Sequence, residues 1–187
     1  SDAIMVARGD LAVEVGDAAV PALQKRMIST ARANNKVVVT ATQMMESMIM
    51  SPIPTRAEVS DVANAVLDGT DAVMLSAESA AGEYPVESVK AMARVCLEAE
   101  KEYQVSHNNR RVPGAHSVSI EEAIARATMF TTGSLKIRAI AALTHSGVTV
   151  LLMSRRSSKV PIFALSPQED TRRKVTLFRG VYPVEFG

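Results

Sequence analysis

The sequence predicts an α/β protein in which short buried strands alternate with helices. Apolar segments centred on Ile4, Val38 and Val73 recur about every 35 residues, the length that a parallel strand–helix–strand unit needs. Polar residues follow each segment, and helical patterns lie between them. This spacing indicates part of a (β/α)8 TIM barrel, and a doubly wound sheet is the alternative architecture.

The first predicted strand is Ala3–Ala7, which we expect to be fully buried and to end in a charged turn, Arg8-Gly9-Asp10. The carboxyl ends of strands are where α/β enzymes place their chemistry. Gly9 would let the backbone approach a ligand closely, and Asp10 offers hard oxygen ligands suited to Mg²⁺. A plain surface turn is the competing interpretation.

The second unit begins with an amphipathic helix over 22–33 that ends near Asn34 and Asn35. A buried strand, Val37–Ala41, follows and leads into Thr42 and Gln43. We assign the next methionines, Met44, Met45, Met48 and Met50, to core packing and to no chemistry.

The third unit follows a proline-containing connection over 51–55, where Thr55 and Glu58 form a capping box for a helix that Gly69 ends. We expect its apolar face to be Val59, Val62, Ala63 and Val66. The third buried strand is Ala72–Leu75. Pro85 then begins a helix whose apolar side is Val89, Met92, Ala93 and Cys96.

Polar side chains follow all three strands, with Ser76, Glu78 and Ser79 after the third. In a barrel the strand ends converge on one face, so that Asp10, Thr42 and Glu78 would surround a single ligand. A doubly wound sheet would instead spread these ends along a line, with a site only where the strand order reverses.

A polar, irregular stretch over 106–117 predicts a linker between a barrel part at 1–105 and a smaller α/β domain at 118–187. In that domain Ser119 and Glu122 form a capping box for a helix. Its expected buried stripe is Ile120, Ala123, Ile124 and Ala127.

Strands are expected over 137–143, 160–165 and 181–186 of the second domain. Residues 148–156 pose a conflict, because VTVLLM favours a strand whereas parallel connectivity requires a crossover helix; we favour the helix. A further helix is expected to start with an N-cap, a first-turn proline and a capping-box acid at Ser166, Pro167 and Glu169.

Composition narrows the class of protein. The chain of 187 residues is 47% hydrophobic, which is ample for a packed core. Lys and Arg number 21 against 20 Asp and Glu, so bulk charge predicts neither nucleic acid nor an anionic membrane as a partner. The single cysteine, Cys96, suits a reducing compartment. Without a signal-like or membrane-spanning segment, the sequence predicts a soluble, cytoplasmic protein.

The motifs MVARGDLAVE, TATQMMESM, PTRAEVSDVANAVLDGTDAVMLSAES and ALTHSGVT, in this order, closely resemble the pyruvate kinase family. The resemblance runs from the sixth barrel strand into the regulatory carboxyl-terminal domain. It therefore implies the last three βα units of the barrel followed by a three-layer α/β domain. LTHSGVTVLLMSRRSSKVPIFALSP is similar to bacterial members.

The resemblance implies phosphoryl transfer from phosphoenolpyruvate to ADP, giving pyruvate and ATP, with Mg²⁺ (or Mn²⁺) and K⁺. Asp10 would bind the divalent metal, and the backbone of Ala7, Arg8, Gly9 and Asp10 would hold the substrate carboxylate. Thr42 would lie beside the enolate carbon and order a proton-relaying water. The family's catalytic lysine, second metal-binding glutamate and K⁺ site would precede Ser1, so the isolated chain is expected to be inactive.

The resemblance also implies a regulatory site and a homotetramer. The effector loop, which would bind the phosphate of a sugar phosphate or AMP, corresponds to Thr144, His145, Ser146, Gly147 and Thr149. Helix N-terminal N–H groups and hydroxyls would suit a phosphate, whereas plain helix capping by Ser146 and Thr149 is the alternative.

The chain departs from the family pattern at Ala12 after RGDL, in the SGET motif, which here is Ser76, Ala77, Glu78 and Ser79, and at Val148, where an arginine is frequent. The last removes a cation from the effector loop, so the positive charge is expected from Arg155 or Arg156. An alternative function is a non-catalytic module for effector binding and assembly.

Overall fold

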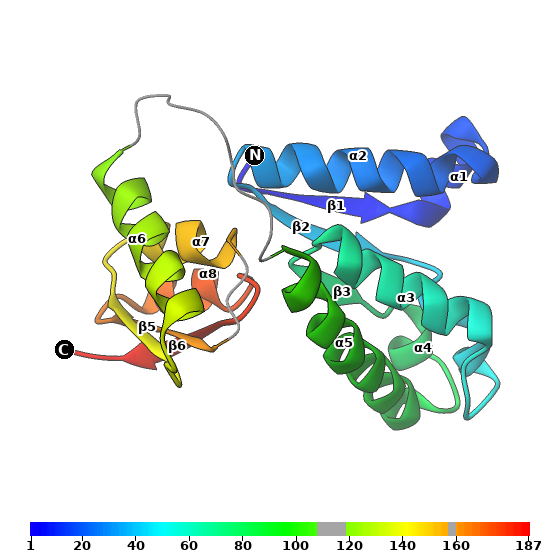
Figure 1. The fold of residues 1–187 in the computed structure, drawn as a ribbon. Helices are drawn as coiled ribbons and strands as arrows, with labels where there is room; N and C mark the ends of the chain where they lie inside the picture. Colours follow the sequence, from blue (N-terminus) through cyan, green and yellow to red (C-terminus); the bar gives the residue numbers. More distant parts are fainter. Residues whose placement is uncertain (108–118, 157–159) are drawn as a thin grey trace. The chain divides into compact units, whose positions relative to one another are not determined.

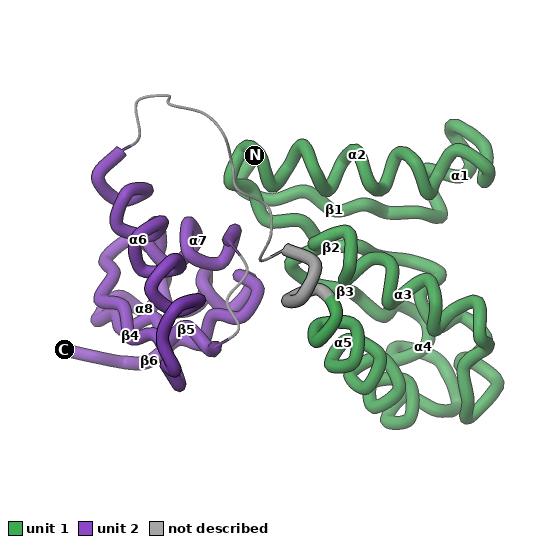
Figure 2. The backbone as a smooth tube through the Cα atoms, in the orientation of Figure 1, with its two compact units in different colours: residues 1–103 green, residues 104–187 purple. Residues whose placement is uncertain are grey.

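The computed structural model describes residues 1–107, 119–156 and 160–187, with the backbone alone at 103–107. Within these residues the chain divides into two compact units, 1–103 and 104–187, drawn in different colours in Figure 2. The predicted linker over 106–117 lies outside the described residues from 108 onward. Each unit is therefore described by itself.

The first unit is built on a three-stranded parallel sheet in the order β1-β2-β3. Ile4 pairs with Val38, and Thr40 pairs with Val73, so the repeat in the sequence becomes the register of the sheet. The strands follow one another in sheet order, as in a barrel, and long helices connect them (Figure 1). These elements are β1 (Ala3–Ala7), α2 (Val20–Ala33), β2 (Val37–Ala41), α3 (Arg56–Asp68), β3 (Ala72–Met74) and α5 (Pro85–His107).

Short elements occupy the carboxyl ends of the strands. They are α1 (Arg8–Val15), the 3-10 turns η1 (Asp17–Ala19) and η2 (Glu46–Ile49), and α4 (Ala77–Ala80). The expected charged turn at Arg8-Gly9-Asp10 is wrong in its form, because these residues make the first turn of α1 directly after β1. The three residues therefore present helix N-terminal N–H groups.

Two apolar clusters form the core of this unit. Val6, Ile28, Ala31 and Val38 pack α2 against β1 and β2. A second cluster centres on Met44, Met45 and Met48, which are fully buried against α3 and α5. The assignment of these methionines to packing is confirmed, whereas Met50 is 69% exposed and the expectation for it is wrong.

The helix signals were accurate at the ends of α3. Thr55 and Glu58 form the complete capping box, and Gly69 adopts the left-handed conformation that ends the helix. Burial was predicted less well. Met5 of β1 is 53% exposed and Met74 of β3 is 37% exposed, so β2, in which Val39 alone is half-buried, is the most buried of the three strands.

The expected apolar faces of α3 and α5 are displaced. On α3, Val62 and Val66 are buried as expected, but Ala65 completes the face while Val59 is exposed. On α5, Val89 is exposed, as is Ala93. Among the described α5 side chains, at 85–102, Met92 is buried as expected and Cys96 is half-buried, while the other buried residues are Ser88, Ala91 and Ala99.

The second unit also carries a three-stranded parallel sheet, in the order β4-β5-β6. The helix favoured for the ambiguous segment over 148–156 is confirmed, because α7 makes the crossover between β4 and β5. The α/β class is thus confirmed in both units. The elements are α6 (Ile120–Ser134), β4 (Ile140–Leu143), α7 (Val148–Ser154), β5 (Ile162–Ser166), α8 (Glu169–Val175) and β6 (Val181–Glu185).

Three expectations for this unit need correction. On α6 the buried residue is Ala125, whereas Ile120 and Ile124 of the expected stripe are 77% and 51% exposed, and Ala123 and Ala127 are exposed as well. Gln168 is the N-cap of α8, because Ser166 still belongs to β5. The strand expected over 137–143 begins only at Ile140. Within the described residues, no helix is both long and apolar enough to span a membrane.

Candidate active site

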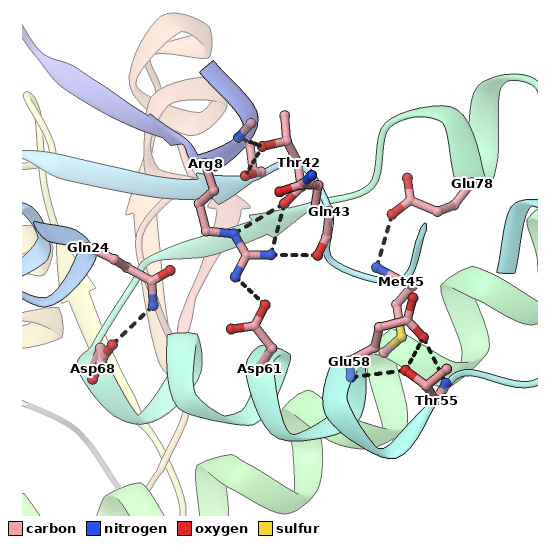
Figure 3. A network of polar contacts seen from close by, with 12 residues as sticks. Arg8, Gln24, Thr42, Gln43, Met45, Thr55, Glu58, Asp61, Asp68 and Glu78 are labelled. Atoms are coloured by element: carbon pink, nitrogen blue, oxygen red, sulfur yellow. Dashed lines mark hydrogen bonds and ion pairs between the residues drawn. The ribbon is translucent and has the colours of Figure 1, made fainter. Parts of the chain in front are cut away.

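The candidate site lies where β1, β2 and β3 end, since parallel strands bring their carboxyl ends to one edge of the sheet. Figure 3 shows the side chains that gather there from α1, α3 and α4 around the backbone that follows β2. The loop over 42–45 is the centre of this arrangement. We call it the β2 loop.

Arg8 holds the start of the β2 loop. Its side chain is buried, and its Nε and Nη2 donate to the carbonyl oxygen of Thr42 at 3.1 and 2.8 Å. Nη2 also donates to the carbonyl oxygen of Gln43 at 2.7 Å, and Nη1 forms an ion pair with Asp61 of α3 (Figure 3). The rigid fork of a guanidinium group makes such simultaneous contacts possible.

Thr42 and Gln43 both have left-handed backbones, with φ of 66° and 53°. This conformation costs a residue other than glycine about 1 kcal/mol or more, and a β-branched threonine is among the least suited to it. The Thr42 hydroxyl accepts a hydrogen bond from the Gly9 N–H at 2.8 Å and donates to the Ala41 carbonyl at 2.6 Å. Thr42 is therefore fixed against the first turn of α1.

Glu78 holds the other end of the β2 loop. Its side chain comes from α4, is 2% exposed, and accepts the Met45 N–H at 3.0 Å through one oxygen. Its second oxygen accepts the Ser76 N–H at 2.7 Å. The strand ends of β2 and β3 are thus joined through one carboxylate, and Glu78 is occupied with backbone rather than turned to a ligand.

Glu58 supports the chain just beyond the β2 loop. Burial alone would raise the pKa of its carboxyl, but hydrogen bonds from the N–H and hydroxyl groups of Ser47 and Thr55 outweigh this and hold the pKa below its ordinary value. These four bonds span 2.6 to 2.7 Å. Glu58 therefore ties η2 to the N-terminus of α3 as a carboxylate.

Asp10 is the exposed carboxylate of the site, in the first turn of α1. Within the described residues, no three His, Cys, Asp or Glu side chains gather closely enough to hold a metal ion by themselves. Mg²⁺ is commonly held by one or two carboxylates together with water and substrate phosphate oxygens. Asp10 fits that mode as one ligand, and it does not amount to a complete protein cage.

Contacts with the residues that the structure describes do not require a glycine at position 9. An added Cβ would lie 3.6 Å from Thr42 Oγ1 and 3.9 Å from Thr42 Cβ, which is ordinary van der Waals contact. The hydrogen bond between Gly9 and Thr42 brings Gly9, its neighbour Asp10 and Thr42 to one place. Of the sequence-predicted trio, Glu78 is at the same strand edge but serves the loop backbone.

The predicted effector loop lies at the carboxyl end of β4. Thr144 Oγ1 accepts the Gly147 N–H at 3.0 Å, and Gly147 has φ of 84° at the N-cap of α7. No side chain caps α7, so the capping role considered for Ser146 and Thr149 is not observed. His145 and Ser146 are exposed, and Thr149 belongs to the first turn of the helix.

The basic residues proposed for this loop lie elsewhere. Arg155 and Arg156 follow the C-terminus of α7, about 10 Å from its N-terminus by the rise of a helix of this length. Arg156 pairs with Glu122 of α6 at 3.2 Å. Both arginines thus follow the opposite end of α7 from the effector loop, which disfavours the expectation that they supply its positive charge.

The fold and the strand-end site define an α/β protein with barrel-type βα units and a second parallel α/β domain. Residues 1–89 match the family model "Pyruvate kinase, barrel domain", and residues 122–187 match "Pyruvate kinase, alpha/beta domain". The chain belongs to the pyruvate kinase family, which depends on metal ions in general.

Relatives agree along the whole chain. It is 57% identical to a pyruvate kinase of Buchnera aphidicola and 57% identical to pyruvate kinase II of Salmonella typhimurium, covering 100% of this chain and 39% of each relative. A crystal structure of a pyruvate kinase from Cryptosporidium parvum matches with a TM-score of 0.93 at 42% identity, over 100% of this chain and 38% of that one. The chain thus spans about two fifths of the length of these relatives.

Proposed function

We propose that this chain contributes part of the active site of a glycolytic pyruvate kinase, which transfers the phosphoryl group of phosphoenolpyruvate to ADP and forms pyruvate and ATP. The observation that carries the proposal is the hydrogen bond of 2.8 Å between the Gly9 N–H and the Thr42 hydroxyl. It brings a threonine to the helix turn that bears Asp10. An anion-binding helix start, a carboxylate and a hydroxyl group thereby share one small surface.

The substrate carboxylate would bind the start of α1. The first N–H groups of a helix have no intrahelical partners, and the helix dipole favours an anion beside them. The residues concerned are Ala7, Arg8, Gly9 and Asp10. Because the Gly9 N–H already bonds Thr42 Oγ1, substrate binding would bring the carboxylate close to that hydroxyl group.

Thr42 would order the water that protonates the enolate. Its hydroxyl donates to the Ala41 carbonyl and accepts from the Gly9 N–H, which leaves one lone pair to accept from a water molecule. An alcohol is too weak an acid to release its own proton readily near neutral pH. Thr42 therefore acts by placing the water rather than by titrating.

A divalent ion, Mg²⁺ or Mn²⁺, would be held by Asp10 together with substrate oxygens, and K⁺ is the second cation of the proposed reaction. When bound, these cations neutralise the charge on the transferring phosphoryl group. The contribution of Asp10 is a carboxylate in the first turn of α1.

The proposal is tested by supplying phosphoenolpyruvate, ADP, Mg²⁺ and K⁺ to a full-length protein that contains this sequence and measuring pyruvate. We expect turnover that stops when either cation is withheld. The polypeptide of 187 residues alone should show no measurable transfer, because a single available carboxylate holds Mg²⁺ poorly. Pyruvate formation by that polypeptide at the rate of the full-length protein would contradict this expectation.

A second proposed role is regulatory. We propose that the loop containing Thr144, His145, Ser146, Gly147 and Thr149 binds the phosphate of a sugar phosphate or of AMP. Its support is the start of α7, where Ser146 is exposed and no side chain takes the cap position. We further propose a cytoplasmic homotetramer as the assembled form. If the full-length protein makes no pyruvate yet binds such effectors, the non-catalytic module becomes the better description.

A further inference from the structure

We propose that Arg8 is a positioning residue for Thr42: its buried guanidinium group fixes the start of the β2 loop so that the threonine hydroxyl meets the first turn of α1. The inference rests on the proposed function, in which Thr42 orders the proton-relaying water. It goes beyond that function because it assigns a role to the Arg8 side chain, whereas only the Arg8 backbone was considered for substrate binding.

The start of the β2 loop has an unfavourable backbone conformation that other contacts must maintain. Thr42 and Gln43 are consecutive non-glycine residues with φ of 66° and 53°, and a β-branched residue rarely adopts such a backbone. A conformation of this kind persists only when surrounding contacts determine it. Something in the structure must therefore hold both residues.

Arg8 contacts these same two residues. Three hydrogen bonds from Nε and Nη2, between 2.7 and 3.1 Å long, reach the carbonyl oxygens of Thr42 and Gln43. The planar guanidinium group presents these donors in a fixed geometry, which a lysine ammonium group cannot reproduce from a single nitrogen. The orientation of two successive peptide groups is thus set by one side chain.

The Arg8 side chain is buried and faces other parts of the protein. It is 5% exposed and directed at the β2 loop and at Asp61, so its charge is engaged within the protein. The Asp61 side chain, on α3, is 43% exposed and keeps the guanidinium group paired. Arg8 therefore acts on the reaction through Thr42 and does not touch substrate.

Arg8 and Glu78 hold different parts of the β2 loop. Glu78 anchors the loop at the Met45 N–H, beyond the strained residues. Arg8 anchors the strained residues themselves through their carbonyls. The loop backbone is thus held at both ends, by the acceptor Glu78 at Met45 and by the donor Arg8 at Thr42 and Gln43. This keeps the Thr42 side chain against Gly9.

The test compares Arg8→Gln and Arg8→Lys in the full-length protein, with Arg32→Gln as the matched control. Arg32 also donates to a backbone carbonyl, that of Gly69 at 2.8 Å, but at the amino end of the strands. Two quantities are measured: kcat against KM for phosphoenolpyruvate, and hydrogen–deuterium exchange of peptides covering 5–15 and 40–48.

We expect Arg8→Gln to lower kcat roughly 10²-fold while KM changes less than about threefold, because misplacing a group in the site costs the chemical step more than binding. Amide exchange should accelerate in both peptides. Arg8→Lys should rescue neither quantity, and Arg32→Gln should leave kcat at the wild-type value.

Asp61→Ala provides a second variant if the Arg8 variants fail to fold, since it removes only the partly exposed ion-pair partner of Arg8. It should lower kcat about tenfold and accelerate exchange in 40–48. The proposal is overturned if Arg8→Lys restores activity, if exchange in the two peptides is unchanged, or if Arg32→Gln lowers kcat as much as Arg8→Gln. If the wild-type protein makes no pyruvate, the proposed function fails, and amide exchange alone still decides whether Arg8 fixes the loop.

Discussion

Each unit has a loop at the carboxyl end of a parallel strand, after the central strand β2 in the first unit and after the edge strand β4 in the second, and the two loops are held differently. In the first unit the β2 loop is clamped by two buried charged side chains from other elements, Arg8 and Glu78. In the second unit the loop after β4 is closed by a bond within itself, from the Gly147 N–H to Thr144 Oγ1.

The two loops differ in how strictly their backbones are fixed. A buried charge is costly unless it is well bonded, and the bonds of Arg8 and Glu78 to backbone groups, with the Arg8–Asp61 ion pair, offset that cost. A self-closed loop with an exposed Ser146 leaves its groups available to a ligand but positions them less strictly. We therefore expect the first loop to affect rate and the second to affect affinity.

The largest effect should come from Asp10→Asn in the full-length protein. This change removes the charge of the proposed metal ligand and keeps its shape, so phosphoryl transfer should slow roughly 10²-fold or more. Titration of activity with Mg²⁺ should show at the same time that a higher Mg²⁺ concentration is needed, because the metal is bound more weakly. A variant with the metal dependence and rate of the wild-type protein would remove Asp10 from the site.

Thr42→Val should have the next largest effect and a different pattern. Losing the hydroxyl that orders a water should slow proton exchange at C3 of pyruvate about 10²-fold, whereas KM should change little. The matched control is Thr40→Val, which removes a buried hydroxyl bonded to Thr70 at 3.0 Å, two residues earlier on β2. A change in KM without a change in proton exchange would make Thr42 a binding residue instead.

Acid should weaken the first unit through Glu58. Because hydrogen bonds lower the pKa of Glu58 in the folded chain, its stabilisation is fully present above the ordinary carboxyl pKa and is lost as the pH falls through the lowered pKa. Glu58→Ala should cost about 1 to 2 kcal/mol at neutral pH, since it removes a capping box. Unfolding followed by urea at several pH values should show the difference between variant and wild type shrinking in acid.

A control for that experiment exists in the second unit. The pKa of Glu122 is also lowered, chiefly by a hydrogen bond from Arg126, but this carboxylate is on the surface of α6. Glu122→Gln should therefore change the pH dependence of unfolding much less than Glu58→Ala. Equal effects of the two substitutions would show that the hydrogen bonds of the first unit add no particular stability.

Local signals predicted the fold well. The repeat of apolar segments gave the strands and their parallel order, and the Thr55–Glu58 pair with Gly69 gave both ends of α3. Helical periodicity predicted the wrong buried face where a helix has apolar residues on more than one side. On α6, Ile120 and Ile124 suggested one face, whereas the chain buries Ala125.

The sequence predicted which residues lie at the candidate site, but not the hydrogen bonds that join them. Asp10 and Thr42 follow strands directly, so parallel topology alone brings them together. The clamp by Arg8 depends on a partner 34 residues away and on two positive φ angles, neither of which leaves a local pattern in the sequence. The charge expected from Arg155 and Arg156 is disfavoured for a related reason, since nearness in sequence ignores the length of the intervening helix.

The smallest effect should be seen in the effector loop. The double substitution Ser146→Ala with Thr149→Ala removes two hydroxyl groups that can complete the hydrogen bonds of a phosphate at the start of α7. Val148 stands where an arginine is frequent, and Arg155 and Arg156 lie at the far end of the helix, so binding should depend largely on neutral donors. Titration calorimetry of the full-length protein with sugar monophosphates and AMP should therefore show modest affinity, weakened only a few-fold, about 1 kcal/mol, by the double substitution. Salt should weaken binding less than it would at a site with a charged arginine. Equal binding by both proteins, or none by either, would leave these hydroxyls without a role in phosphate binding, and the difference between the two strand-end loops would then lie wholly in the first unit.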